Sequence, residues 1–178
     1  IYEKVLGSDH PRLATALNNL ALCHFEQDQF DQADPLFRRA LDIREKVLGP
    51  DHPDVAQTLN NLANLERSRG NFTEAETLYK RALGIRMEAL GEEHPDVGWT
   101  LRDMGILVHR KGDPEEALHL FDQAVAIYEK ALGTRHPDLA EILPDYSAVL
   151  RELGRAFEAD SLDLRVEMIR EEMVSISE

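Results

Sequence analysis

The sequence predicts an all-α fold, an α-solenoid of tandem antiparallel helix pairs, and three observations lead to this class. His-Pro pairs recur every 42 residues, beginning at His10, His52, His94 and His136. A glycine stands three residues before each histidine, and apolar residues recur in step between these marks. A fixed period of this length is the signature of a repeat array, in which each unit buries its apolar face against its neighbours. Such an array favours an extended binding surface over a catalytic pocket.

Composition narrows the class of partner. The chain has 178 residues, of which 43% are hydrophobic and 30% charged, as in a folded, soluble protein. Its net charge of −14 disfavours binding to nucleic acid or to an anionic membrane surface. No apolar run approaches the roughly 18 residues of a membrane span. The single cysteine cannot form an intrachain disulfide, which is compatible with a reducing compartment, and we therefore expect a cytoplasmic protein.

The period divides the chain into repeats. Residues 1–7 read IYEKVLG and match the strings at 43–49 and 127–133, so we expect the chain to open within the second helix of a preceding repeat. Four repeats then follow, at 8–49, 50–91, 92–133 and 134–178. The whole chain is expected to be one array that ends in a capping helix.

The first helix of each repeat is expected to begin at the proline of the His-Pro pair. Proline is tolerated in the first turn because its missing N–H would have no helical partner there. Gly70, Gly112 and Gly154 mark the ends of these helices. Leucine recurs at the fourth position of the apolar face, and a small residue recurs at the eighth, where two helix backbones can approach closely. The small residues are Ala21, Ala63, Gly105 and Ser147.

The second helix of each repeat is expected to begin shortly after the end of the first helix. Thr73 and Glu76 have the spacing of a capping box, and Asp113 followed by Pro114 and two glutamates is a strong helix start. Glycines at 49, 91 and 133 end the second helices just before the next His-Pro turn. The expected buried face begins at an alanine and continues to an aromatic residue four positions later. These aromatic residues are Phe37, Tyr79 and Phe121.

The last repeat departs from the pattern. Pro144 falls inside its first helix and should either kink that helix or delay its start. Asp163 replaces the expected aromatic residue of the second helix, and Glu167 replaces an aliphatic one. Acidic residues on this face indicate that no further repeat stacks there. We therefore expect the C-terminal helix to be a solvated cap.

At this point a resemblance becomes specific. The string LNNLA…GNFTEAETLYKRAL…LG…DHPDVA resembles the tetratricopeptide repeat in the 42-residue form of kinesin light chains and many bacterial multidomain proteins. The resemblance extends from residue 1 to about residue 172. The ending LRELGRAFEADSLDLRVEMIRE is similar to the terminal repeat of bacterial signalling proteins that carry an upstream kinase or nucleotide-binding domain. The resemblance implies a superhelix whose first helices line a concave groove that holds an extended peptide.

A helical wheel identifies candidate binding residues without appeal to the family. At about 100° per residue, one stripe of each first helix points away from the residues that pack. In the first two repeats the candidates on this stripe are Asn19, Gln57, Asn61 and Asn64. In the last two repeats they are Trp99, Asp103, Ile106, Arg110 and Asp145.

Asn19 and Asn61 are the strongest of these candidates. An amide both donates and accepts hydrogen bonds, so it can hold a peptide backbone whatever its sequence. In the family the asparagine of the NLA string serves this purpose, and both residues match it, whereas Asp103 and Asp145 stand there in later repeats. The alternative is that the asparagines make local polar contacts between helices. Trp99 is either a hot spot for an apolar ligand side chain or a residue of ordinary packing.

The charge of the stripe suggests the kind of peptide. The stripe also contains Glu26, Glu141 and Glu152, which bring its formal charge to −4. The flanking Arg67, Arg102 and Arg151 reduce the sum to −1. Kinesin light chains favour acidic peptides, but this surface is not built for them. We expect a neutral or partly basic segment of a protein partner instead.

Catalytic and metal sites are not predicted. Equivalent histidines of successive repeats lie at least a helix width apart, ~10 Å, whereas the ligands of one zinc ion lie ~2 Å from it. The acidic residues follow solvated helix faces and form no isolated pair suited to acid–base chemistry. No cofactor and no enzymatic activity are therefore expected. Cys23 aligns with Leu65, Leu107 and Val149 and should be a buried, inert thiol.

Three functions remain open from the sequence. The leading one is a module that binds an extended segment of a partner protein. The second is an intramolecular regulatory or sensor arm of a larger signalling protein. The third is a self-association scaffold in which the ends of the array stack between chains.

Overall fold

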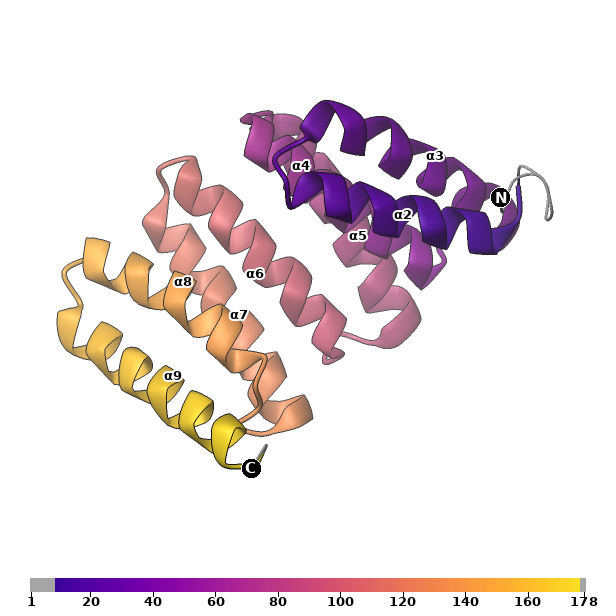
Figure 1. Ribbon diagram of the computed structural model, residues 1–178. Coiled ribbons are helices and arrows are strands. Elements are labelled where there is room, and N and C mark those ends of the chain that lie inside the picture. Colours follow the sequence, from indigo (N-terminus) through magenta and orange to yellow (C-terminus); the bar gives the residue numbers. More distant parts are fainter. Residues whose placement is uncertain (1–8, 177–178) are drawn as a thin grey trace. The chain divides into compact units, whose positions relative to one another are not determined.

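The computed structural model describes residues 9–176, and within them the chain forms eight helices and no strand (Figure 1). The prediction for residues 1–7 lies outside the described residues. The helices are α2 (Pro11–Phe25), α3 (Phe30–Leu48), α4 (Pro53–Arg69), α5 (Phe72–Leu90), α6 (Pro95–Arg110), α7 (Pro114–Leu132), α8 (Leu139–Glu152) and α9 (Ala156–Ile176). The all-α class and the two helices per repeat are confirmed.

The helices form two compact units, residues 1–91 and 92–178. In the first unit, α2 packs on α3 and α4 on α5, and α3 also contacts α4. In the second unit, α6 packs on α7 and α8 on α9, with α7 against α8. Each unit therefore consists of two stacked helix pairs, as the 42-residue period predicts (Figure 1).

The apolar positions predicted from the period form the core of each unit. The recurring leucines Leu17, Leu59, Leu101 and Leu143 are all buried. So are the aromatic residues Phe37, Tyr79 and Phe121 of the second helices. The small residue Gly105 shows why size matters here, because an added Cβ would lie 3.1 Å from the Phe121 ring. Helix pairs approach this closely because the eighth position carries almost no side chain.

His10, His52 and His94 are the N-cap residues of α2, α4 and α6, and His136 makes the same local bond just before α8, whose N-cap residue is Asp138. The Nδ1 atom accepts a hydrogen bond from the backbone N–H two residues later, at 3.1 Å in His10, His52 and His94 and at 3.3 Å in His136. In α2, α4 and α6 this satisfies a helix N–H that has no intrahelical partner. The sequence pattern marked these residues as turn residues but did not reveal this bond.

The starts of the second helices follow the prediction in one repeat and depart from it in another. Asp113 accepts a bond from the backbone N–H of Glu116 at 3.1 Å, as predicted. The capping box at Thr73 and Glu76 is wrong, because α5 begins at Phe72 with Asn71 as its N-cap residue. Thr73 therefore already lies inside the first turn of the helix.

In the last repeat α8 begins at Leu139, whereas α2, α4 and α6 begin at the proline of the turn. Pro144 lies inside α8 and cannot donate to the carbonyl of Ala140, one turn earlier. The delayed start that was predicted for this helix is therefore observed.

The prediction that Cys23 is buried is wrong, because its side chain is exposed. Its counterpart Leu65 is buried because it packs on Ala33 and Phe37 of the preceding second helix, α3. No such helix precedes α2 among the residues that the structure describes. Burial at this position depends on a neighbouring repeat rather than on the residue itself.

Candidate functional site

In the first unit, the candidate face consists of the exposed sides of α2 and α4. The paired asparagines of the NNL strings divide between interior and surface. Asn18 and Asn60 are buried, whereas Asn19 is exposed and Asn61 is half-buried. Successive residues of a helix point about 100° apart, so adjacent asparagines reach different environments. The exposed Asn19 makes no hydrogen bond among the described residues.

Asn61 is held in place by a neighbouring first helix. Its Nδ2 atom donates to the Oδ1 atom of Asn18 at 3.0 Å, which links α4 to α2. The carbonyl oxygen of Asn61 accepts no hydrogen bond within the described part of the chain. A half-buried amide with one fixed bond loses less side-chain entropy on binding a ligand than a free one. The sequence analysis missed Asn18, although its position next to Asn19 in a repeated NN pair was the available signal.

Asn64 and Gln57 are tied more tightly to the structure. The Oδ1 atom of Asn64 accepts from the hydroxyl of Tyr79 at 2.6 Å and from Arg67 at 2.9 Å. The Oε1 atom of Gln57 accepts from the guanidinium of Arg44 at 3.1 Å. Tyr79 and Arg44 are both buried and belong to second helices. Buried residues of the second helices therefore hold the side chains of these two candidates in place.

Arg44 also joins one repeat to the next. Its guanidinium donates to the carbonyl of Asp54 and to the hydroxyl of Thr58, both at 2.7 Å. Burial lowers the pKa of Arg44, and the charge of Asp54 opposes this change. The end of α3 is thereby bound to the first turns of α4.

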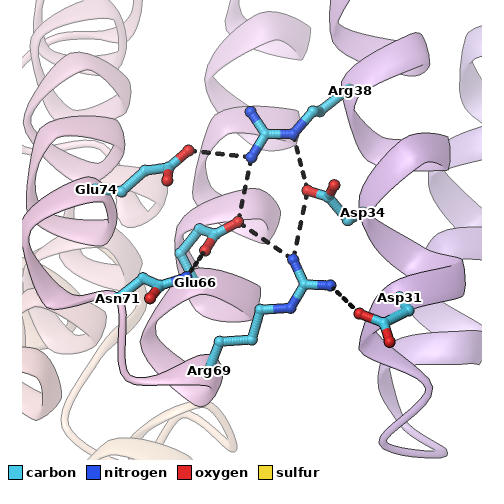
Figure 2. A network of polar contacts seen from close by, with 7 residues as sticks. All are labelled: Asp31, Asp34, Arg38, Glu66, Arg69, Asn71 and Glu74. Carbon is cyan, nitrogen blue, oxygen red and sulfur yellow. Dashed lines mark hydrogen bonds and ion pairs between the residues drawn. The ribbon is translucent and has the colours of Figure 1, made fainter.

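Behind this face, a network of charges joins α3, α4 and the start of α5 (Figure 2). Its centre is the buried carboxylate of Glu66, which lies 3.2 Å from Arg38 and 3.6 Å from Arg69 and accepts from Asn71 at 2.7 Å. The guanidiniums also meet carboxylates at the rim of the network, and these are Asp31, Asp34 and Glu74.

The electrostatics of the network favour a structural role. Burial lowers the pKa of Arg38, but the hydrogen bonds and charges of Glu74 and Asp34 outweigh it and raise that pKa overall. Both guanidiniums are occupied by carboxylates of the same unit. The network therefore fixes α4 against α3 and offers little to an external anion.

In the second unit, the candidate face carries an aromatic and a charged group instead of amides. Trp99 is half-buried and meets Tyr128 edge-on, with ring centroids 5.5 Å apart. The guanidinium of Arg102 lies 5.4 Å from the centroid of the Trp99 ring. Gly98 makes room for this arrangement, because an added Cβ would lie 2.6 Å from the Tyr128 ring.

Arg102 also pairs with Asp145 of the next first helix. Its Nε and a terminal nitrogen lie 3.0 and 2.6 Å from Asp145 Oδ2, which links α6 to α8. Asp103 is buried and lies 3.7 Å from the same guanidinium. Ile106 is half-buried and packs against the core of this unit. Arg110, at the end of α6, is exposed and makes no ion pair among the described residues.

The three arginines that flank the stripe are occupied by internal partners. Arg67 donates to Tyr79 and Asn64, and Arg102 pairs with Asp145. Arg151 turns to α9, where it contacts Asp160 at 2.8 Å and Asp163 at 2.5 Å. The simple charge sum of the sequence analysis therefore overstates the positive charge available to a ligand.

The described residues hold no group of three or more His, Cys, Asp or Glu side chains that could bind a metal ion. None of the described helices is long and apolar enough to cross a membrane.

Comparison with known proteins identifies the family. The tetratricopeptide repeat family model matches residues 1–46, 12–86, 54–130 and 109–167. A search of curated protein sequences finds no significant match. Among solved structures, BtubC (BKLC) from P. vanneervenii is 26% identical with a TM-score of 0.79, and the match covers 92% of this chain and 66% of BtubC.

A kinesin light chain-type protein of nearly identical TPR-like repeats from Podosopora anserina is also similar. It is 26% identical with a TM-score of 0.70, and the match covers 97% of this chain and 82% of that protein. Aspartyl phosphate phosphatase F from Bacillus subtilis shares the fold alone, with 16% identity and a TM-score of 0.79 over 92% of this chain and 41% of its own. This chain thus spans only part of two of these proteins. It belongs to the tetratricopeptide repeat family, in the kinesin light chain-like form, and has the all-α solenoid fold of protein-interaction scaffolds.

Proposed function

We propose that the chain binds an extended segment of a partner protein along its first helices, α2 and α4 in one unit and α6 and α8 in the other. The observation that carries the proposal is the pair Asn19 and Asn61. Asn19 is exposed, and Asn61 is fixed by Asn18 with its carbonyl oxygen left available. Such amides can hold the N–H and C=O groups of an extended backbone.

The second unit supports the proposal through different chemistry. The Trp99 ring is half-buried, rests on Tyr128 and carries the Arg102 guanidinium. A supported indole of this kind is a common anchor for an apolar ligand side chain. The Arg102 guanidinium is paired with Asp145 and lies 3.7 Å from Asp103, so the ring lies in a setting without excess positive charge.

We further propose that the bound segment is neutral or partly basic. The flanking arginines are occupied by internal partners, whereas Glu26 and Glu141 on the stripe are exposed. Arg110, at the end of α6, is the exposed positive charge on the stripe. An acidic segment would therefore meet more repulsion than a basic one.

A binding experiment tests the function. A library of extended peptides is displayed against the full chain, and the peptides that bind are titrated by fluorescence anisotropy. Asn19→Ala combined with Asn61→Ala should weaken binding by about tenfold or more, the value of one to two hydrogen bonds. The matched control is Gln123→Ala, which removes an exposed amide from a second helix.

The alternatives give different outcomes. Loss of binding in the double asparagine variant but not in the control supports the proposal, and equal binding in all three proteins contradicts it. If no free peptide binds but a segment from the same polypeptide does, the module is an intramolecular regulatory arm. A mass that rises with concentration would favour self-association.

A further inference from the structure

The C-terminal helix α9 carries an apolar stripe that nothing in the described structure covers. The side chains of Phe157, Leu164 and Met168 are 88%, 61% and 50% exposed. At about 100° per residue, these three positions fall within about 40° of one another on the helix. The residues that pack α9 into its unit, Val166 and Ile169, point to the other side and are buried.

The same face is not apolar on the other second helices. Counting back by one, two and three periods from the stripe gives charged, polar or small residues in each case. They are Glu115, Asp122 and Ala126 in α7, then Thr73, Lys80 and Gly84 in α5, then Asp31, Arg38 and Asp42 in α3. The repeat architecture therefore does not require apolar residues here, and their presence on α9 needs a reason of its own.

The stripe also refines the prediction of a solvated cap. Glu167, on the flank where a further repeat would stack, is exposed as expected. The stripe lies next to it on the same flank, because Asp31 and Arg38, the residues of α3 at the positions of Phe157 and Leu164, pair with Arg69 and Glu66 of the next repeat. On α9 this surface is apolar and uncovered within the described residues, and an exposed apolar helix face at regular spacing is typical of an interaction site.

The charges beside the stripe indicate what covers it. Glu167 and Glu171 are exposed along one edge, and α9 as a whole has six carboxylates and two arginines, a net charge of −4. The arginine on the other edge, Arg165, is already bound to Glu129 and to the carbonyl of Thr134, both at 2.6 Å. An approaching surface therefore meets apolar groups bordered by unpaired negative charge.

We propose that this stripe docks an amphipathic helix of a partner protein, with apolar residues spaced i, i+4, i+7 and lysine or arginine along the edge that meets Glu167 and Glu171. A second copy of α9 is disfavoured as the partner, because two helices that each have a net charge of −4 would repel each other. Three exposed side chains also fall well short of the roughly 800 Å² per partner of a stable interface, which fits a transient partner better than a dimer. Negative charge likewise opposes docking on an anionic membrane.

The test uses a synthetic helical peptide of about 18 residues with leucines along one stripe and lysines on both edges. Two control peptides accompany it, one with glutamates in place of the lysines and one with the same composition in scrambled order. Binding to the full chain is followed by fluorescence anisotropy at two salt concentrations, and helical folding of each protein variant is checked by circular dichroism.

The expected result is saturable binding of the lysine peptide that is lost with both control peptides. Leu164→Gln combined with Met168→Gln should weaken it by about tenfold or more, since two buried aliphatic contacts disappear. Glu167→Gln combined with Glu171→Gln should weaken it by about threefold and reduce its salt dependence. The matched control is Val174→Gln, which removes a side chain that is 62% exposed on the same helix but lies about 100° from the stripe.

Two results would overturn the proposal. In the first, the scrambled peptide binds as well as the helical one, or Val174→Gln has the same effect as the stripe variant. In the second, sedimentation shows a dimer that Leu164→Gln with Met168→Gln abolishes, which would assign the stripe to a second copy. Asn19→Ala with Asn61→Ala should leave binding of the lysine peptide unchanged, so this test is independent of the proposed peptide-binding function.

Discussion

The two units join their first helices at the same pair of repeat positions but with different chemistry. In the first unit Asn61 of α4 donates to Asn18 of α2, and in the second Asp145 of α8 accepts from Arg102 of α6. Asn18 and Arg102 are two periods apart in sequence, as are Asn61 and Asp145. The repeat thus fixes where consecutive first helices touch, while the residues decide whether the contact is a neutral amide pair or an ion pair that also covers a tryptophan.

A second difference lies in the interior. Glu66 is a buried carboxylate at the centre of the network in Figure 2, and two periods later the same position is the buried Leu150. Near it the second unit stacks Phe121 on Tyr146, with ring centroids 5.9 Å apart. The first unit is therefore held partly by charges that need each other, and the second mainly by apolar and aromatic packing.

The largest expected effect is on this buried charge. Glu66→Gln removes the carboxylate and leaves Arg38 and Arg69 without their central partner, which should lower the free energy of unfolding of the first unit by about 3 kcal/mol. Urea denaturation combined with hydrogen exchange would measure the loss unit by unit. The control is Glu74→Gln at the exposed rim of the network, where a loss below about 1 kcal/mol is expected. Equal losses would mean that burial of Glu66 does not matter.

The next effect contrasts two helical glycines. Gly98→Ala places a methyl group against the Tyr128 ring and should destabilise the second unit by about 1–3 kcal/mol and alter the Trp99 fluorescence. Gly84→Ala in α5 meets nothing within 4 Å and should instead stabilise the first unit by up to about 1 kcal/mol. Thermal melts of both variants test the pair, and effects of the same sign would contradict the packing described for Trp99.

The histidine of the last repeat should contribute less to stability than the histidine caps of the other first helices. His52→Ala removes the bond to the backbone N–H of Asp54 and should cost about 1 kcal/mol, whereas His52→Ser should retain most of the stability. His136→Ala should cost less, because α8 begins only at Leu139 and the bond there is longer. Chemical denaturation would compare the variants, and a larger loss at His136 than at His52 would contradict this order.

The ion pair between Arg102 and Asp145 should contribute little to the free energy of unfolding, and its contribution should depend clearly on salt. A double-mutant cycle with Arg102→Asn and Asp145→Asn should give a coupling of about 0.5–1 kcal/mol at low salt, falling as salt rises. The same cycle with Asn18→Ala and Asn61→Ala should be insensitive to salt. Identical salt responses would remove the distinction between a charged and a neutral contact.

The smallest effect concerns acid pH. The hydrogen bond from Arg151, together with that from Ser147, lowers the pKa of Asp163 below its usual range. The stability from this pair is therefore present at neutral pH and is lost as the pH falls through the lowered pKa. Asp163→Asn should flatten the acid limb of the stability profile of the second unit slightly. An unchanged profile would show that the pair does not contribute.

Much of the fold follows from the sequence because its signals are local. The prolines, the glycines and the alternation of leucine with small residues fix the helices and their buried faces. The contacts between repeats are not local. Glu66 reads as an ordinary acidic residue in α4, and only the stacking of α3 and α5 around it makes it the centre of a network.

The candidate residues show the same limit. The helical wheel placed Asn19 and Asn61 on one stripe, but whether a residue on that stripe is exposed depends on its neighbours. Asp103 is buried, and Asn64 is bound by Tyr79. Cys23 failed in the opposite direction, because the residues that bury its counterpart Leu65 belong to another helix.

Arg44 has a consequence for how such chains diverge. One of its two shortest hydrogen bonds to the following helix is to the main-chain oxygen of Asp54, a group that every amino acid supplies. A joint made to the backbone tolerates almost any substitution in the outward-pointing side chains beyond it. The contact that positions α4 is thereby separate from the side chains that would bind a ligand. The exposed side chains of α4 can therefore change during evolution without loss of this contact.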